Sequence, residues 1–126
     1  MKIKILILLT LISLLSGCSS QKEDNFPPEL TGLWKTKEPR YDGCSFEISP
    51  TRIIFSNMHE DYSGINSIRS IEKSQEGGQT TYNIEYENRE GLVYKTSLVY
   101  VKSGNTEITY FKNQKDVKWT KEDAPG

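Results

Sequence analysis

The sequence predicts an all-β domain, an antiparallel up-and-down barrel of about eight strands, behind an apolar N-terminal segment. Short runs rich in Ile, Val, Thr, Tyr and Phe recur along the chain, separated by Gly, Asn, Asp and Ser, which is the pattern of strands and turns. No convincing helical spacing interrupts them. The connections are short, which favours pairing between neighbouring strands. Closure removes exposed edges, so a barrel is favoured over a sandwich.

The chain begins with a segment typical of a secretory signal peptide. Lys2 and Lys4 precede an apolar run that ends at Leu15 and is followed by small residues. This run is shorter than the roughly 20 residues that a membrane-spanning helix needs. A positive start, a short apolar run and small residues predict cleavage.

Leu15-Ser16-Gly17-Cys18 closes this segment and resembles the lipobox of bacterial lipoproteins. The resemblance implies cleavage between Gly17 and Cys18 and transfer of a diacylglyceryl group to the Cys18 thiol. It also implies further acylation, palmitate included, and a protein that is anchored to a membrane and does not span it. Several acyl chains hold a protein durably, whereas one binds only marginally.

The residue after Cys18 bears on which membrane receives the protein. It is Ser19, with no Asp beside the anchor, which resembles the default outer-membrane case in Gram-negative bacteria. The implied location is the bacterial cell envelope, at the periplasmic face of the outer membrane if the organism has one.

The mature chain suits one domain. Removing residues 1–17 leaves 109 residues, enough for a modest core. Residues 18–30 are polar and contain Pro27-Pro28, so we expect the lipidated Cys and a tether that does not order by itself. The barrel is expected over 31–122, followed by a polar tail at 123–126.

Alternating apolar and polar residues predict the first strands. After an opening run at 33–36, a half-buried strand at 44–49 has the period of two. Pro50 then predicts a tight turn, because it fixes φ and cannot continue a central ladder. The apolar positions of this hairpin are Cys44, Phe46, Ile48, Ile53 and Phe55.

Paired glycines mark the clearest hairpin. Gly77-Gly78 lies at the centre of 75–79 and supplies the positive φ of primed turns. It follows a loop at 57–64 and a weak strand at 65–74. The next strand has one apolar face, which consists of Tyr82, Ile84 and Tyr86.

The last third of the domain contains the longest apolar strand, at 92–101, after a turn at 88–91. A turn at 103–105 leads into a strand at 106–112. Val117 and Trp119 mark the final strand. In these strands we expect the following residues to face inward: Leu92, Tyr94, Leu98, Tyr100, Ile108, Tyr110 and Trp119.

Gly32-Leu33-Trp34, at the start of the first strand, resembles the Gly-x-Trp signature of lipocalin and calycin barrels. The resemblance implies that Gly32 permits close backbone approach and that Trp34 plugs the closed end, where an Arg of the last strands commonly covers the ring. The final strand departs from this pattern, because it offers Lys118 and Lys121 but no Arg, and the second motif of the family is not found near the middle of the chain. The alternative is that Trp34 is a core residue of an unrelated sheet.

The sequence contains no pattern of a reaction centre or a cofactor site, and we expect neither enzymatic activity nor a cofactor. His59, the only His, lies in a predicted loop, without a metal-site spacing. Cys44 has no partner for a disulfide once Cys18 carries lipid. It is either a small buried residue of a strand, or a reactive thiol or one half of an intermolecular disulfide.

Three functional classes remain, in this order: a protein-interaction or accessory module, a small-ligand binding barrel and, far behind them, an enzyme. The mature charge is −3, from 14 Lys and Arg against 17 Asp and Glu once Lys2 and Lys4 are removed, which argues against nucleic acid as a partner. Anchoring and small size favour a protein-interaction or accessory module with an envelope or extracellular partner. The alternative is a barrel that binds a small apolar ligand. The bulky inward set predicts a filled interior, with no cavity of the size of a lipid.

Overall fold

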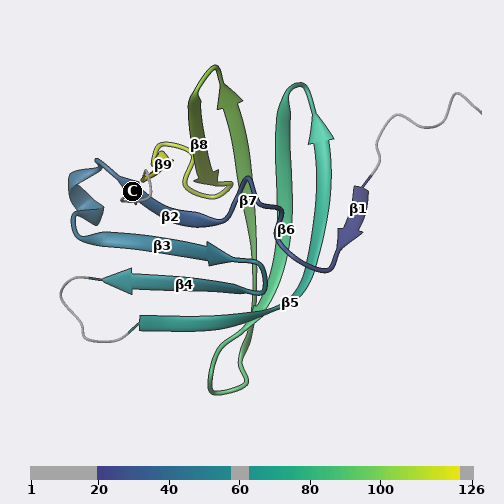
Figure 1. Ribbon diagram of the computed structural model, residues 1–126. Helices are drawn as coiled ribbons and strands as arrows, with labels where there is room; N and C mark the ends of the chain where they lie inside the picture. The colour runs from purple at the N-terminus through teal and green to yellow at the C-terminus, as the bar shows by residue number, and fades with distance from the viewer. Residues whose placement is uncertain (1–19, 58–62, 123–126) are drawn as a thin grey trace, which may run out of the picture.

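The computed structural model describes residues 20–57 and 63–122 (Figure 1). These residues form an all-β structure whose only helical element is one 3-10 turn, η2 (Pro39–Tyr41). The strands are β1 (Ser20–Glu23), β2 (Gly32–Thr36), β3 (Cys44–Ser49), β4 (Arg52–Asn57), β5 (Ser63–Glu76), β6 (Gln79–Glu87), β7 (Val93–Ser103), β8 (Thr106–Phe111) and β9 (Trp119–Lys121). No helix in these ranges has the length and apolar character needed to cross a membrane.

Strands β2 to β9 form a closed antiparallel barrel. Each strand pairs with the next along the chain, and β9 pairs with β2, with Trp34 opposite Lys121. The pairing of β5 with β6 links the two halves of the sheet. The prediction of an eight-stranded antiparallel up-and-down barrel is confirmed.

The long strand β5 pairs with three neighbouring strands, β1, β4 and β6. Its first residues pair with β4, and most of its length pairs with β6 across an irregularity between Ile68 and Ser70. Its later residues pair with β1, with Ser20 opposite Ser74. In Figure 1, β1 lies beside β5, away from η2.

The barrel has two different ends. The closed end contains the β3–β4, β5–β6 and β7–β8 turns and is crossed by the segment 24–31, whose Phe26 N–H donates to the Pro50 carbonyl at 2.9 Å. The open end contains η2, the β6–β7 turn and the connection at 112–118. The buried core consists of Phe26, Leu30, Trp34, Phe46, Ile48, Ile53, Ile71, Tyr82, Ile84, Leu98, Tyr100, Val117 and Trp119.

The expected tether at 18–30 differs from the structure over its described part. Residues 20–23 form β1, and the side chains of Phe26 and Leu30 are buried in the core. The sequence does not predict their burial, because two isolated apolar residues form no periodic pattern that would indicate a strand or a helix. They are covered only where the chain crosses the closed end.

The inward set is corrected on β7 and β8. Tyr94 is opposite the inward Tyr86, next to the β6–β7 turn, and Leu92 lies in that turn. Both are exposed, at 45% and 53%. On β8, Thr109 pairs with the inward Tyr100, and Phe111 pairs with the inward Leu98. Alternation therefore puts Ile108 and Tyr110 on the outer face.

Candidate binding site

An aromatic cavity of about 370 Å³ opens at the open end of the barrel. This volume lies in the lower part of the range of protein ligand sites. Seven elements contribute to its lining, namely η2, β3, β4, β5, β8, the connection at 112–118 and β9. The lining consists of Tyr41, Cys44, Ser45, Phe46, Phe55, Ser56, Gly64, Phe111, Gln114 and Trp119. The space exists because Gly64, opposite Phe55 in the β4–β5 ladder, adds no side chain to the interior.

Phe46 forms the floor of the cavity. Its ring centroid lies 5.1 Å from that of Trp119 and 5.3 Å from that of Phe111. On the other side, the centroid of Trp34 lies 6.2 Å away. This ring cluster fills the middle of the barrel, so the expectation of a filled interior holds from the closed end to Phe46 but not at the open end. The remaining space is not filled by Leu92 and Tyr94, which are exposed. Nor is it filled by Ile108 and Tyr110, which face outward.

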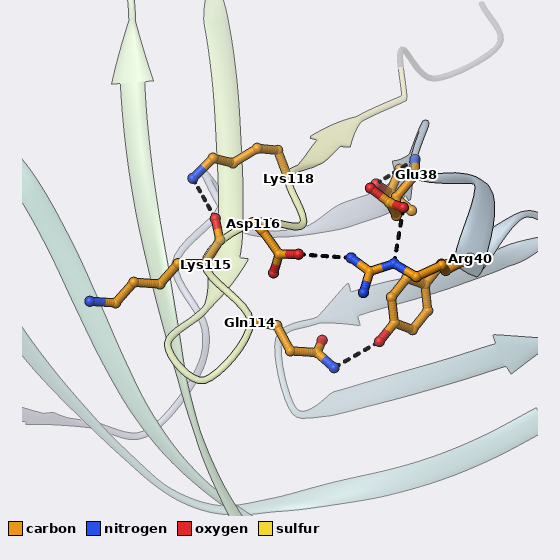
Figure 2. Close-up of polar contacts among 8 residues, drawn as sticks. Glu38, Arg40, Gln114, Lys115, Asp116 and Lys118 are labelled. Atoms are coloured by element: carbon orange, nitrogen blue, oxygen red, sulfur yellow. Dashed lines mark hydrogen bonds and ion pairs between the residues drawn. The ribbon is translucent and has the colours of Figure 1, made fainter.

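Two side-chain contacts tie η2 to the connection between β8 and β9 beside the cavity (Figure 2). The Gln114 amide donates to the Tyr41 hydroxyl at 2.8 Å, and the Arg40 guanidinium donates to Asp116 Oδ2 at 2.8 Å. Arg40 also donates to Glu38 at 3.0 Å. The hydrogen bond from Arg40 lowers the pKa of Asp116, and the bond to Asp116 raises the pKa of Arg40.

We call the Tyr41–Gln114 and Arg40–Asp116 contacts the mouth bridge. Arg40 and Asp116 are well exposed, and an exposed ion pair stabilises little. The Tyr41–Gln114 contact is partly buried and lines the cavity itself. The mouth bridge therefore defines one wall of the cavity more than it stabilises the fold.

A row of aromatic rings leads from the opposite wall to the surface. The centroid of Phe55 lies 6.0 Å from that of Tyr86, and Tyr86 stacks on Tyr94 at 5.6 Å. Tyr94 ends the row in a segment that we call the apolar rim, Leu92, Val93 and Tyr94. Within 20–57 and 63–122, these three are the exposed large hydrophobic residues.

The turn before the apolar rim is held by Asn88. Its Oδ1 accepts hydrogen bonds from the backbone N–H groups of Glu90 and Leu92, each at 2.9 Å. Its own N–H donates to the Leu92 carbonyl at 2.9 Å. Local bonding of this kind is a known use of Asn in turns. The rim is thus presented by an ordered turn.

Cys44 lies at the start of β3, half-buried, and lines the cavity. Its thiol is free in the described part of the chain. The position fits the expected strand residue and also gives the cavity a thiol.

Two polar atoms of the interior lack a partner in the described part of the chain: Nε1 of Trp119 and Oγ1 of Thr109. The two residues are opposite each other in the β8–β9 ladder. A buried polar atom without a hydrogen bond costs its desolvation free energy. An apolar group of the same shape in either place would not carry this cost.

Gly32 and Trp34 lie at the closed end. The Trp34 ring is fully buried and its Nε1 donates to the Leu30 carbonyl at 2.9 Å. The Lys121 ammonium lies 5.4 Å from the ring centroid. Gly32 has a φ of +139°, and a Cβ there would lie 3.4 Å from the Lys121 side chain. Gly32 thus leaves room for the lysine that covers Trp34, whereas Lys118 lies over the outer ring of Tyr110.

A polar network surrounds this lysine. Lys121 donates to the Glu29 carbonyl at 2.6 Å and lies 3.6 Å from Glu107. The Tyr82 and Tyr100 hydroxyls donate to the carboxylates of Glu29 and Glu107 at 2.9 and 2.7 Å. Burial is the largest cause that raises the pKa of both tyrosines, and the hydrogen bond to the carboxylate is the second. The closed end is thus sealed by polar contacts over an apolar plug.

A second hollow, of about 570 Å³, crosses the outer face of β5, β6 and β7. Four of its polar side chains bond in pairs, since Ser97 donates to Asn83 at 2.6 Å and Ser70 donates to Glu85 at 3.2 Å, and Glu72 accepts from Ser20. We therefore treat the aromatic cavity as the candidate site.

Several predicted positions lie outside the described residues, namely Gly17, Cys18 and His59. Within the described ranges, no group of three or more His, Cys, Asp and Glu side chains is arranged to hold a metal ion.

Sequence reasoning missed the mouth bridge and the apolar rim. The tight turn around η2 could have been found from Pro39 and Gly43, but its contact with Asp116 could not.

No protein-family model, curated protein or solved structure matches the chain.

Proposed function

We propose that this chain is a lipid-anchored lipoprotein of the bacterial envelope, held through Cys18, whose barrel is a non-enzymatic binding module. Its open end would receive an apolar group of an envelope or extracellular protein. One observation carries this proposal: a row of packed aromatic rings runs from Phe55, which lines the cavity, through Tyr86 to Tyr94 of the exposed apolar rim.

The combination of a cavity and a rim favours a protein partner. Exposed apolar side chains beside a pocket are a mark of interaction surfaces. Binding energy at such surfaces concentrates in an aromatic or aliphatic anchor that fills a pocket. About 370 Å³ suits an anchor of this size, and Leu92 and Tyr94 would cover its surroundings.

The lining chemistry supports binding more than catalysis. The described lining residues offer a thiol on Cys44, while Ser45 and Ser56 alternate with inward residues and turn their hydroxyls to the outer face. None of the lining residues carries a carboxylate or an imidazole. Activation of such a nucleophile needs an adjacent base.

The alternative function is lipocalin-like binding of a small apolar ligand in the same cavity. The contact that favours it is at the closed end, where Lys121 covers Trp34 beside Gly32; the Gly-x-Trp resemblance implies an Arg in this place.

Site-specific photo-crosslinking in cells tests the protein-partner proposal. A photoreactive residue replaces Tyr94 in the apolar rim, and a matched one replaces Glu47, which is exposed on the outer face of β3. We expect one defined envelope or extracellular protein to be captured from position 94 and not from 47. Equal patterns at both positions would reject the rim as the interaction surface.

Native mass spectrometry of the purified protein tests the alternative. A stoichiometric bound molecule that is lost in Cys44→Phe, which fills the cavity, and kept in Thr120→Phe, which adds the same ring outside, would support ligand binding. Without such a molecule, the alternative fails.

A further inference from the structure

We propose that the closed end of the barrel lies against the membrane surface and that the open end, with its cavity, faces away from it. This orientation rests on the anchoring of Cys18 in the proposed function. The partner surface is the lipid headgroup layer that holds the acyl chains of Cys18.

The direction in which the chain enters the barrel carries the argument. Strand β1 runs antiparallel to β5, with Ser20 opposite Ser74 and Glu23 opposite Ile71. The Ser20 hydroxyl also donates to Glu72 at 2.7 Å. Since β5 runs from the open end to the closed end, Ser20 lies toward the β5–β6 turn, at the closed end (Figure 1).

The segment between Ser20 and the barrel is held in place along its length. After β1, the Phe26 N–H is bonded to the Pro50 carbonyl, and the side chains of Phe26 and Leu30 are buried. Residues 20–30 are therefore attached at several points, so they do not let the domain rotate freely above an anchor.

The distances decide the orientation. Two peptide units separate Cys18 from Ser20, so their Cα atoms are at most about 7.6 Å apart. Strand β7, which runs between the two ends, has 11 residues and extends roughly 33 Å at about 3.3 Å per residue. An anchor at Cys18 thus stays near the closed end and does not reach the open end.

The orientation gives the two ends different surroundings. Exposed residues of the β5–β6 hairpin, Glu76 and Gln79 among them, would lie near the headgroups. The apolar rim and the mouth bridge would face the aqueous side, where a partner protein or a ligand can reach them.

Fluorescence quenching on vesicles tests this orientation. The full-length, acylated protein, with Cys44→Ser to remove the free thiol, is reconstituted into phosphatidylcholine–phosphatidylglycerol vesicles that contain a headgroup-nitroxide lipid. An environment-sensitive dye is attached at Gln79→Cys, at the closed end, or at the matched exposed position Glu90→Cys, in the β6–β7 turn. We expect a large loss of fluorescence at 79 and little loss at 90.

Two outcomes would overturn the proposal, and they are distinguishable. Equal quenching at both positions, or stronger quenching at 90, in a protein whose mass includes the acyl groups would reject the orientation and leave the anchor intact. A mature protein without acyl mass would reject the anchor, and the orientation with it.

Discussion

At the residue scale, stability is concentrated in the ring cluster and the plug of the closed end. Trp34 contacts Phe46 on one face and has Lys121 over its ring, and its indole N–H is bonded to Leu30. The neighbouring wall of Thr109 and Trp119 contains polar atoms that have no partner among the residues the structure describes. We expect substitutions in these two regions to change the free energy of unfolding in opposite directions.

Trp34→Ala should lower the free energy of unfolding by about 3 to 5 kcal/mol, because a fully buried large side chain leaves a cavity that its neighbours fill only in part. Urea denaturation measures the change. Tyr94→Ala, which truncates an exposed ring, should cost much less. Equal losses for the two variants would contradict the assignment of Trp34 to the core.

Thr109→Val should raise the free energy of unfolding by about 1 kcal/mol, because it keeps the shape of the side chain and removes a buried hydroxyl without a partner. The same denaturation experiment measures it. A destabilised variant would show that this hydroxyl has a partner in solution.

The tyrosines of the closed end should make the protein sensitive to alkali. Their pKa values are raised in the folded state above the unfolded value of about 10, so their contribution is complete below about pH 10 and is lost as the pH rises above it. Denaturation measured between about pH 8 and pH 11 should therefore show a constant contribution up to about pH 10 and a loss of stability above it. Tyr82→Phe with Tyr100→Phe should make the loss shallower. A slope unchanged in the double variant would reject this origin.

At the element scale, the segment before β2 belongs to the folded barrel. Strand β1 extends the edge of β5, and residues 24–31 cover the closed end. These contacts determine both the core at that end and the direction from which the chain arrives. The segment is short and polar, so its stability depends on very few apolar side chains.

Phe26→Ala should lower the free energy of unfolding by about 3 kcal/mol, because its ring is almost fully buried. Thermal and urea denaturation measure this loss, with the exposed Leu92→Ala as a control. A change within about 0.5 kcal/mol would mean that the segment is a tether after all.

At the scale of the whole molecule, one end of the barrel is sealed and the other is open. The closed end combines an apolar plug with a polar network, while the open end has a cavity, the mouth bridge and the apolar rim. A division of this kind suits a module that is held at one end and binds at the other.

Cys18→Ala should move the protein from the membrane fraction to a soluble or unprocessed form, because it removes the proposed lipid acceptor. Fractionation and labelling with a radioactive fatty acid measure this change. Trp34→Phe, which leaves Cys18 intact, is the matched control. Incorporation of label into the Cys18→Ala protein would contradict the proposed lipidation site.

Local patterns in the sequence determined the strands and most of the turns. The alternation of Cys44, Phe46 and Ile48 predicted β3, and Gly77 and Gly78 have the positive φ of the hairpin that they predicted. The number of strands and their short connections predicted the barrel. These features could be predicted because period and turn chemistry act between residues that are close in the chain.

The site was decided only by the tertiary structure. The face that β8 turns inward depends on its register against β7, and a shift of one residue exchanges Ile108 and Tyr110 for Thr109 and Phe111. The mouth bridge joins Arg40 to Asp116, which are 76 residues apart. Phe26 and Leu30 are buried only because the chain crosses the closed end. Each of these contacts depends on which distant strands meet when the barrel closes, and no local pattern of residues encodes that meeting.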